Sequence, residues 1–114
     1  MDKLERPILW AGDSLEAVRN LPEEDRSKVG FELHRLQNSD IGEMMSSRKV
    51  QQISGVEDIY QLRARDIRLF FSLLENGGKI VILSVTRRKN LRDSISELEK
   101  RRHEASKRLE RNGV

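Results

Sequence analysis

The chain has 114 residues, of which 36% are apolar and 36% are charged, and its formal net charge is +3. A chain of this length has room for one modest core, so we expect a single domain spanning residues 1–114. The absence of cysteine excludes disulfides, thiol nucleophiles and thiolate metal sites. With no run of about eighteen apolar residues and no basic-then-apolar leader, we expect no membrane segment and a cytoplasmic location.

Positive charge is concentrated in the last quarter of the chain. After Thr86, ten Lys and Arg residues accompany five Asp and Glu residues, whereas the part before has twelve basic and fourteen acidic residues. Clustered positive charge gains affinity for polyanions by releasing counterions. A nucleic acid or an acidic protein is therefore a candidate partner, although a solvated helix face has the same composition.

The first part of the chain predicts a strand and two helices. Residues 7–11 (PILWA) have the composition of a short strand. A helix is predicted after Asp13, a suitable cap with Glu16 three residues later. Pro22 suits the first position of a second helix, which has acidic residues in its first turn and should end near Asn38. The apolar spacing of both helices predicts a helix hairpin with one buried face.

The stretch 39–54 gives weaker signals. Its first part (NSDIGEMMSS) is typical of a connecting loop with turn formers. We interpret Met44 and Met45 as apolar residues that fill gaps in the core rather than as ligands. The RKVQQI segment (48–53) fits either an edge strand or an ordered loop.

Residues 59–73 (IYQLRARDIRLFFSL) alternate as two strands joined by a tight turn do. With Arg65 and Asp66 as the turn, Arg63 lies directly opposite Arg68. One face of the hairpin is then apolar, and the other carries the two arginines. The apolar face is predicted to hold Tyr60, Leu62, Ala64, Ile67, Leu69, Phe71 and Leu73.

The Asn-Gly pair at 76–77 predicts a second tight turn, because Asn and Gly readily adopt the positive φ angles of a type I′ hairpin. This turn places Val85 opposite Arg68 on the next strand. By strand alternation, Arg87 then lies on the same face as Arg68 and Arg63.

Like charges directly opposite each other on neighbouring strands are unfavourable by a few tenths to about 1 kcal/mol. Pairing Arg63 with Arg68 is explained if an anion such as a phosphate lies between them. The alternative is that each arginine meets a carboxylate or extends along Phe70 into water. The same face carries apolar residues that need cover from the C-terminal helix together with a partner segment. These are Ile59, Phe70, Val81 and Leu83.

A long amphipathic helix is predicted from 91 to 110, after a cap at Asn90. Its apolar residues are sparse and its opposite face is basic. The predicted fold class is therefore α+β: an N-terminal strand and a helix hairpin packed on an antiparallel meander, followed by a basic C-terminal helix.

The order of these elements, together with three segments, resembles the RelE/HigB superfamily of bacterial toxins, in particular its phage-related HigB-like branch. The segments are ILWAGDSLEAVRNLPEEDRSKVGFELHRLQ, GVEDIYQLRARDIRLFF and SVTRRKN. Residues 68–71 (RLFF) stand where the family has Arg, two hydrophobic residues and Tyr, and residues 87–89 (RRK) stand where it has a basic Lys-Lys segment. The resemblance covers nearly the whole chain and implies a RelE/ParE-like fold.

The resemblance implies the toxin of a type II toxin–antitoxin module. Such toxins enter the ribosomal A site and cleave the exposed mRNA, acting as endoribonucleases through 2′-OH attack without a metal or another cofactor. A tightly bound antitoxin protein blocks them, and the complex binds operator DNA to repress its own operon. The implied partners are thus an antitoxin, the ribosome with mRNA and, through the complex, DNA, but no membrane.

The resemblance also implies positions for the site. The catalytic positions correspond to Arg63, Arg68, Arg88 and Lys49. The RNA-binding candidates are Arg87, which is added from strand alternation, and Lys89 and Arg92 in the basic segment after it. Arginine suits the binding of a phosphate because its planar fork donates two hydrogen bonds. We expect Arg68→Ala to remove growth inhibition and to leave the fold stable.

Proton transfer is where the sequence departs from the family. Several relatives have a tyrosine or a histidine after the last strand, and Ser94 stands near that position here. Tyr60, the only tyrosine, belongs to the predicted core face. Arginine itself does not lose its proton near neutral pH, so Lys49 and His103 are the remaining candidates.

Two other function classes fit the same features. ParE-like toxins share the fold and poison DNA gyrase without cutting RNA. A non-catalytic module would hold a nucleic-acid backbone with the same arginines. Fold alone does not separate these classes, because function depends on the site.

Overall fold

The computed structural model describes residues 6–53, 56, 58–88 and 95–112. The strands in this part of the chain are β1 (Ile8–Trp10), β2 (Val50–Gln52), β3 (Tyr60–Ala64), β4 (Ile67–Leu74) and β5 (Lys79–Arg87). They form one sheet in the order β1-β5-β4-β3-β2, in which β1 runs parallel to β5 and the other neighbours are antiparallel. The helices are α1 (Ser14–Arg19), α2 (Glu23–Asn38), α3 (Ile41–Ser46) and α4 (Ile95–Asn112).

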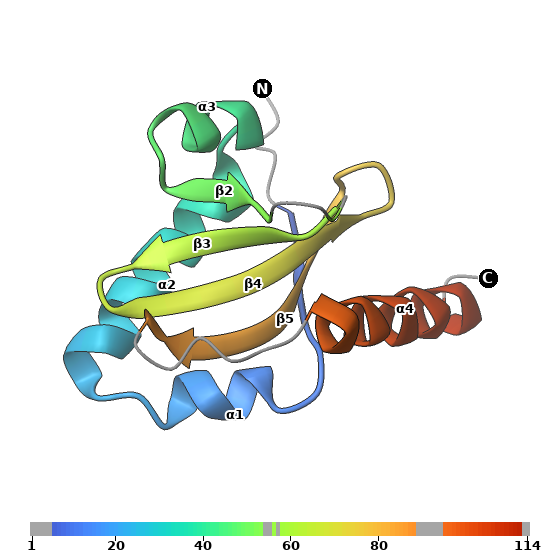
Figure 1. The fold of residues 1–114 in the computed structure, drawn as a ribbon, viewed down its shortest axis with the longest axis horizontal. Helices are drawn as coiled ribbons and strands as arrows, with labels where there is room; N and C mark the ends of the chain where they lie inside the picture. Colours follow the sequence, from blue (N-terminus) through green and yellow to red (C-terminus); the bar gives the residue numbers. More distant parts are fainter. Residues whose placement is uncertain (1–5, 54–55, 57, 89–94, 113–114) are drawn as a thin grey trace.

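The sheet separates two apolar clusters, and α2 passes behind the sheet in the view of Figure 1. Helices α1 and α2 pack on the side that we call the α2 face, where Leu62, Leu69 and Phe71 are fully buried. Helix α4 packs on the opposite side, the α4 face, where Leu98 contacts a cluster that includes Phe70 and other apolar residues. The predicted α+β class, with a helix hairpin, a meander and a C-terminal helix, is confirmed.

The helix hairpin has nearly the predicted bounds. Helix α2 begins directly after Pro22 and ends at Asn38, with Val29 and Leu36 fully buried at helical spacing. The predicted capping box of α1 is wrong, because the side chain of Asp13 makes no capping hydrogen bond. A carboxylate oxygen of Asp13 instead lies 4.0 Å from the guanidinium of Arg101 on α4.

Gly30 lies in the middle of α2 on its exposed side, and a Cβ added there would meet nothing within 4 Å. Glycine in a helix interior is less favourable than alanine by roughly 0.5–1 kcal/mol. We therefore expect Gly30→Ala to raise the free energy of unfolding by about that amount, as measured by equilibrium urea denaturation. A lower denaturation midpoint would contradict the open surroundings of this residue.

The segment after α2 is a helix rather than the predicted loop. Asp40 caps α3 by accepting a hydrogen bond from the backbone N–H of Gly42 at 2.8 Å. Met44 is buried in the core as predicted, whereas Met45 is 38% exposed and does not fill a gap. The RKVQQI segment forms the edge strand β2, which was one of the two expectations for it.

The first predicted hairpin register is confirmed. Arg65 and Asp66 connect β3 to β4, and Arg63 lies directly opposite Arg68. Tyr60 pairs with Phe71 at the other end of the same ladder. All seven residues of the predicted apolar face belong to the cluster on the α2 face.

The second hairpin follows the predicted register for only half of its length. The turn forms as expected, with positive φ angles at Asn76 and Gly77, and Phe71 pairs with Ile82. A β-bulge then follows, so that Phe70 pairs with Ser84 rather than with Leu83. The predicted pairing of Arg68 with Val85 is therefore wrong, and Thr86 takes that place.

The bulge reverses the sides of the last residues of β5. Because side chains alternate along a strand, one extra residue moves every later side chain to the other face. Val85 now packs with the cluster on the α2 face, and Arg87 lies opposite Ile67, a core residue of that face. Arg88 follows the end of β5, where its backbone N–H donates to the carbonyl oxygen of Asp66 at 2.7 Å.

The apolar residues of the α4 face are covered within the chain itself. Ile59, Phe70, Val81 and Leu83 are at most 6% exposed, and the helix α4 packs over their cluster. The expected exposed patch that a partner segment would share is therefore wrong. Among the described residues, no helix is both long enough and apolar enough to cross a membrane.

Candidate nucleic-acid interface

The candidate site lies where β3 turns into β4. Arg63 and Arg68 face each other across these strands on the α4 face. Helix α4 lies toward the opposite end of the sheet, so it does not cover the β3–β4 turn (Figure 1). Arg63 is exposed, whereas Arg68 is only 5% exposed.

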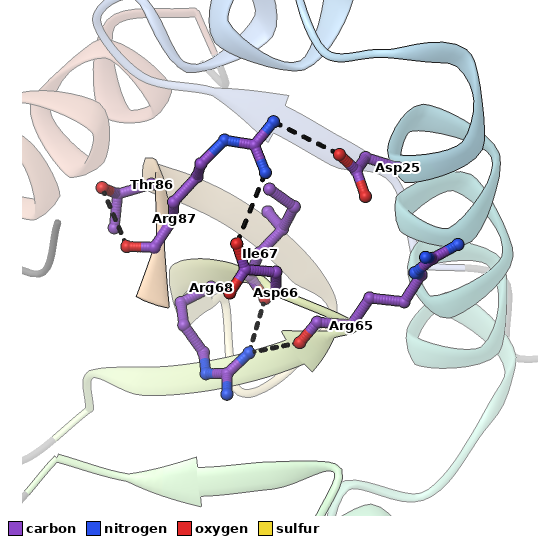
Figure 2. A network of polar contacts seen from close by, with 7 residues as sticks. All are labelled: Asp25, Arg65, Asp66, Ile67, Arg68, Thr86 and Arg87. Carbon is purple, nitrogen blue, oxygen red and sulfur yellow. Dashed lines mark hydrogen bonds and ion pairs between the residues drawn. The ribbon is translucent and has the colours of Figure 1, made fainter. Parts of the chain in front are cut away.

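Arg68 binds the backbone of the turn. One terminal nitrogen of its guanidinium, Nη1, donates hydrogen bonds to the carbonyl oxygens of Arg65 at 2.7 Å and Ile67 at 3.1 Å (Figure 2). Arg65 has a φ of +57°, which is unfavourable for a residue with a side chain. The buried guanidinium therefore stabilises a strained turn as well as adding positive charge.

Positive charge from three arginines converges at this point. Burial lowers the pKa of Arg68, the neighbouring Arg63 and Arg88 lower it further, and Asp66 acts in the opposite direction. A guanidinium nonetheless stays protonated near neutral pH. We call Arg63, Arg68 and Arg88 the arginine cluster; repulsion among these cations favours a bound anion.

Arg87 is not part of this cluster. Its guanidinium lies 3.3 Å from the carboxylate of Asp25 on α2 and 3.4 Å from that of Asp66. Figure 2 shows the side chains of Arg87 and Arg68 extending away from each other. The prediction that Arg87 shares a face with Arg63 and Arg68 is therefore wrong, and the β-bulge is the reason. Its RNA-binding role stays a prediction.

The other predicted site residues are only partly placed by the structure. Arg88, which the family resemblance assigned to the site, acts electrostatically on Arg68 by lowering its pKa, and its backbone N–H donates to the carbonyl oxygen of Asp66 at 2.7 Å. Lys89 and Arg92 lie outside the described residues, as do Asn90 and Ser94.

The hydrogen bonds of Arg68 change the expectation for its removal. Arg68→Ala leaves two buried or partly buried carbonyl oxygens without their charged donor, and such losses cost about 1–3 kcal/mol. We expect this decrease in the free energy of unfolding, measured by urea denaturation. A variant as stable as the parent chain would contradict a structural role for Arg68.

A pocket of about 380 Å³ adjoins the arginine cluster. Five of its six lining residues are basic, and they come from α2, the connection between α3 and β2, β3, and the β3–β4 turn. We call it the basic pocket. It is lined by Lys28, Ser47, Arg48, Lys49, Arg63 and Arg65.

A buried carboxylate lies behind two of these lysines. Glu32 on α2 is 0% exposed, and one of its oxygens lies 3.1 Å from Nζ of Lys28 and 3.4 Å from Nζ of Lys49. Its other oxygen lies 3.5 Å from the guanidinium of Arg35. Sequence reasoning missed Glu32, although its position three residues after Val29, within the apolar stripe of α2, was a signal.

Of the residues considered for proton transfer, Tyr60 and His103 lie away from the basic pocket, whereas Lys49 lines it. Tyr60 is half-buried on the α2 face and stacks on Phe71 with ring centroids 5.4 Å apart, as expected of a core residue. His103 is exposed on α4, and the basic pocket is not lined by it. Lys49 does line the pocket, where its ammonium is paired with Glu32. The described site thus offers positive charge and hydrogen-bond donors.

No family model and no curated protein matches the sequence. Solved structures do match the fold. A chain of the RelE–RelB complex from Pyrococcus horikoshii OT3 superposes with a TM-score of 0.61 at 18% identity, over 75% of this chain and 98% of that one. The chain has the RelE fold.

Two Escherichia coli structures support the RelE fold. The isolated RelE toxin has a TM-score of 0.54 at 18% identity, over 91% of this chain and 98% of that one. The intact RelBE toxin–antitoxin complex gives 0.56 at 18% identity, over 72% of this chain and 95% of that one. The expected RelE-like fold is confirmed, while the HigB-like branch stays a prediction.

Proposed function

We propose that this chain is the toxin of a type II toxin–antitoxin module and cleaves mRNA on the ribosome. The observation that supports the proposal is the arginine cluster: Arg63 faces Arg68 across β3 and β4, Arg88 lowers the pKa of Arg68, and Arg63 also lines the basic pocket. Among the described residues, no carboxylate forms an ion pair with these three arginines. The RelE fold supports the same class of protein.

The cluster suits the charge that develops during RNA cleavage. The 2′-oxygen bonds to phosphorus as its proton leaves, and the 5′-oxygen departs with the electrons of the broken P–O bond and takes up a proton. Arg63 and Arg88 donate hydrogen bonds to the phosphate oxygens as negative charge grows. Arg68 is buried, adds positive charge, and holds the β3–β4 turn through its hydrogen bonds to the backbone.

Proton transfer in this proposal does not depend on the arginines. Lys49 contributes an ammonium group as a hydrogen-bond donor, and Glu32 holds this group in the wall of the basic pocket at 3.4 Å. Water and the ribosome, which aligns the 2′-oxygen with the phosphate, supply the rest of the catalysis through positioning. The roles of Lys89 and Arg92 in binding RNA belong to the proposal as well, with at most a minor contribution from Arg87, whose guanidinium is paired with Asp25 and Asp66.

An antitoxin is the proposed protein partner, in the cytoplasm. In two of the matching structures, from Pyrococcus horikoshii OT3 and Escherichia coli, RelE is in a complex with RelB. The partner would block the arginine cluster, and the complex would bind operator DNA.

Primer extension on mRNA from cells that express the chain tests the proposal. We expect cuts within codons of translated messages, and no such cuts when Arg63→Ala is expressed at the same level. Intact messages together with stalled replication would instead indicate a gyrase poison. Intact messages without growth inhibition would indicate a binding module, and either result would contradict the proposal.

A further inference from the structure

The basic pocket extends the positive surface away from the arginine cluster. Arg63 belongs to both, whereas Lys28, Arg48 and Lys49 line the pocket alone. The lining contains five basic side chains and no carboxylate. A polynucleotide that places one phosphate at the arginine cluster therefore meets a second cationic cavity along its backbone.

The burial of Glu32 is difficult to explain by stability. Its neighbours on the buried stripe of α2 are Val29, Leu33 and Leu36, and all three are apolar. Both carboxylate oxygens are inaccessible, and neither accepts a well-aligned hydrogen bond within the described residues. Burying a carboxylate is costly, and replacing a buried ion pair by apolar residues of similar volume is often neutral or stabilising.

The contacts of Glu32 suggest what this unfavourable burial provides. The carboxylate lies 3.1 Å from Nζ of Lys28 and 3.4 Å from Nζ of Lys49, yet these two side chains remain 33% and 36% exposed. One negative charge thus holds two flexible ammonium groups in the wall of the pocket without removing them from solvent. Such unfavourable burial is expected at functional sites.

We propose that the basic pocket is a subsite for a second phosphate of the RNA backbone, and that Glu32 is a positioning residue that aims Lys28 and Lys49 into it. This inference rests on the proposed function, because it takes RNA as the ligand of the neighbouring cluster. Continuity through Arg63 favours a polyanion with regularly repeated charges over an acidic protein segment.

The test measures the salt dependence of RNA binding by the full chain. The probe is a fluorescent RNA of about ten nucleotides, in the range of single-strand binding sites, with 2′-O-methyl groups that prevent cleavage. We expect the Lys28→Ala, Arg48→Ala double variant to bind about tenfold more weakly at low salt. Its slope of log affinity against log salt should fall by about 0.7, the value for one lost phosphate contact on a single strand.

The matched control is Lys79→Ala, which removes one lysine at the opposite end of β4 and β5. It should leave the slope within error of the parent chain. A slope for the double variant equal to that of the control would overturn the subsite. Loss of affinity for a polyglutamate peptide without a change in the RNA slope would assign the pocket to a protein partner and would equally overturn it.

Glu32→Leu and Glu32→Gln test the positioning role. We expect both to fold, because the three cations around Glu32 are partly exposed and can be solvated without it, and to lose about as much RNA affinity as Lys28→Ala. Unchanged affinity, or unfolding of both variants, would refute that role. Cleavage of mRNA with no effect of the pocket variants would refute the subsite alone, whereas an altered RNA slope without mRNA cleavage would refute the proposed ribonuclease function alone.

Discussion

Arg63→Ala is expected to reduce ribosome-dependent mRNA cleavage by about a hundredfold or more while the fold stays intact. Removing one donor aimed at developing negative charge typically lowers the rate about 10²–10³-fold. Arg63 is exposed and faces another arginine, so its loss removes repulsion instead of packing. The free energy of unfolding should stay unchanged or rise by up to about 1 kcal/mol. Cleavage rates on stalled ribosomes, together with urea denaturation, measure both effects.

Arg87 and Arg88 provide a matched control, because they are neighbours with the same side chain, but Arg87 is paired with carboxylates whereas Arg88 lowers the pKa of Arg68. Arg88→Ala should lower the cleavage rate as Arg63→Ala does. Arg87→Ala should retain most cleavage and lose up to about 1 kcal/mol of stability, because its ion pairs with Asp25 and Asp66 are partly exposed. Equal losses of cleavage in both variants would contradict the placement of Arg87 on the α2 face, which results from the β-bulge.

Phe71→Ala is expected to lower the free energy of unfolding by about 3–5 kcal/mol, the range for removing a buried aromatic ring. Phe71 is 0% exposed, stacks on Tyr60 and lies directly beside the bulge. Single domains are stable by only about 5–15 kcal/mol, so the variant should have little stability left. Urea denaturation followed by circular dichroism measures the loss.

Phe31→Ala is the control for that substitution. Phe31 is 54% exposed on α2 and contacts Lys28 with its ring. Its removal should change the free energy of unfolding by no more than about 1 kcal/mol. Equal decreases in the free energy of unfolding for Phe71→Ala and Phe31→Ala would contradict the placement of Phe71, and not Phe31, in the apolar cluster on the α2 face.

The sequence predicted the sheet where local chemistry determines the register. Arg65 and Asp66 lie between two alternating runs, so a turn at this pair places the seven residues of the predicted apolar face on one side and Arg63 opposite Arg68. The pair at 76–77 fixed the second turn for a similar reason. Strand alternation carried the register correctly from there to Phe71 and Ile82.

The bulge was beyond this reasoning. The run VILSVT in β5 consists of small or apolar residues that fit either face, so an extra residue leaves no pattern in the sequence. The consequence appears four residues later, where Arg87 lies on the α2 face instead of the predicted face with Arg63 and Arg68. The family resemblance assigned Arg88 to the site, whereas strand alternation had assigned Arg87.

Helix α3 and Glu32 were missed for different reasons. A helix of six residues with a glycine has weak propensity, and it forms because Asp40 caps it and Met44 packs into the core. Glu32 was not singled out from the sequence, and glutamate is rarely buried without partners. Its partner Lys49 is distant in sequence and is brought close only by tertiary structure.

Purified ribosomes with a defined mRNA codon in the A site provide the most direct test of mRNA cleavage by the arginine cluster. We predict that the chain cuts the message within that codon and that the 5′ fragment ends in a 2′,3′-cyclic phosphate. Arg63→Ala should yield almost no product. An uncut message, or a cut that persists unchanged in Arg63→Ala, would contradict it.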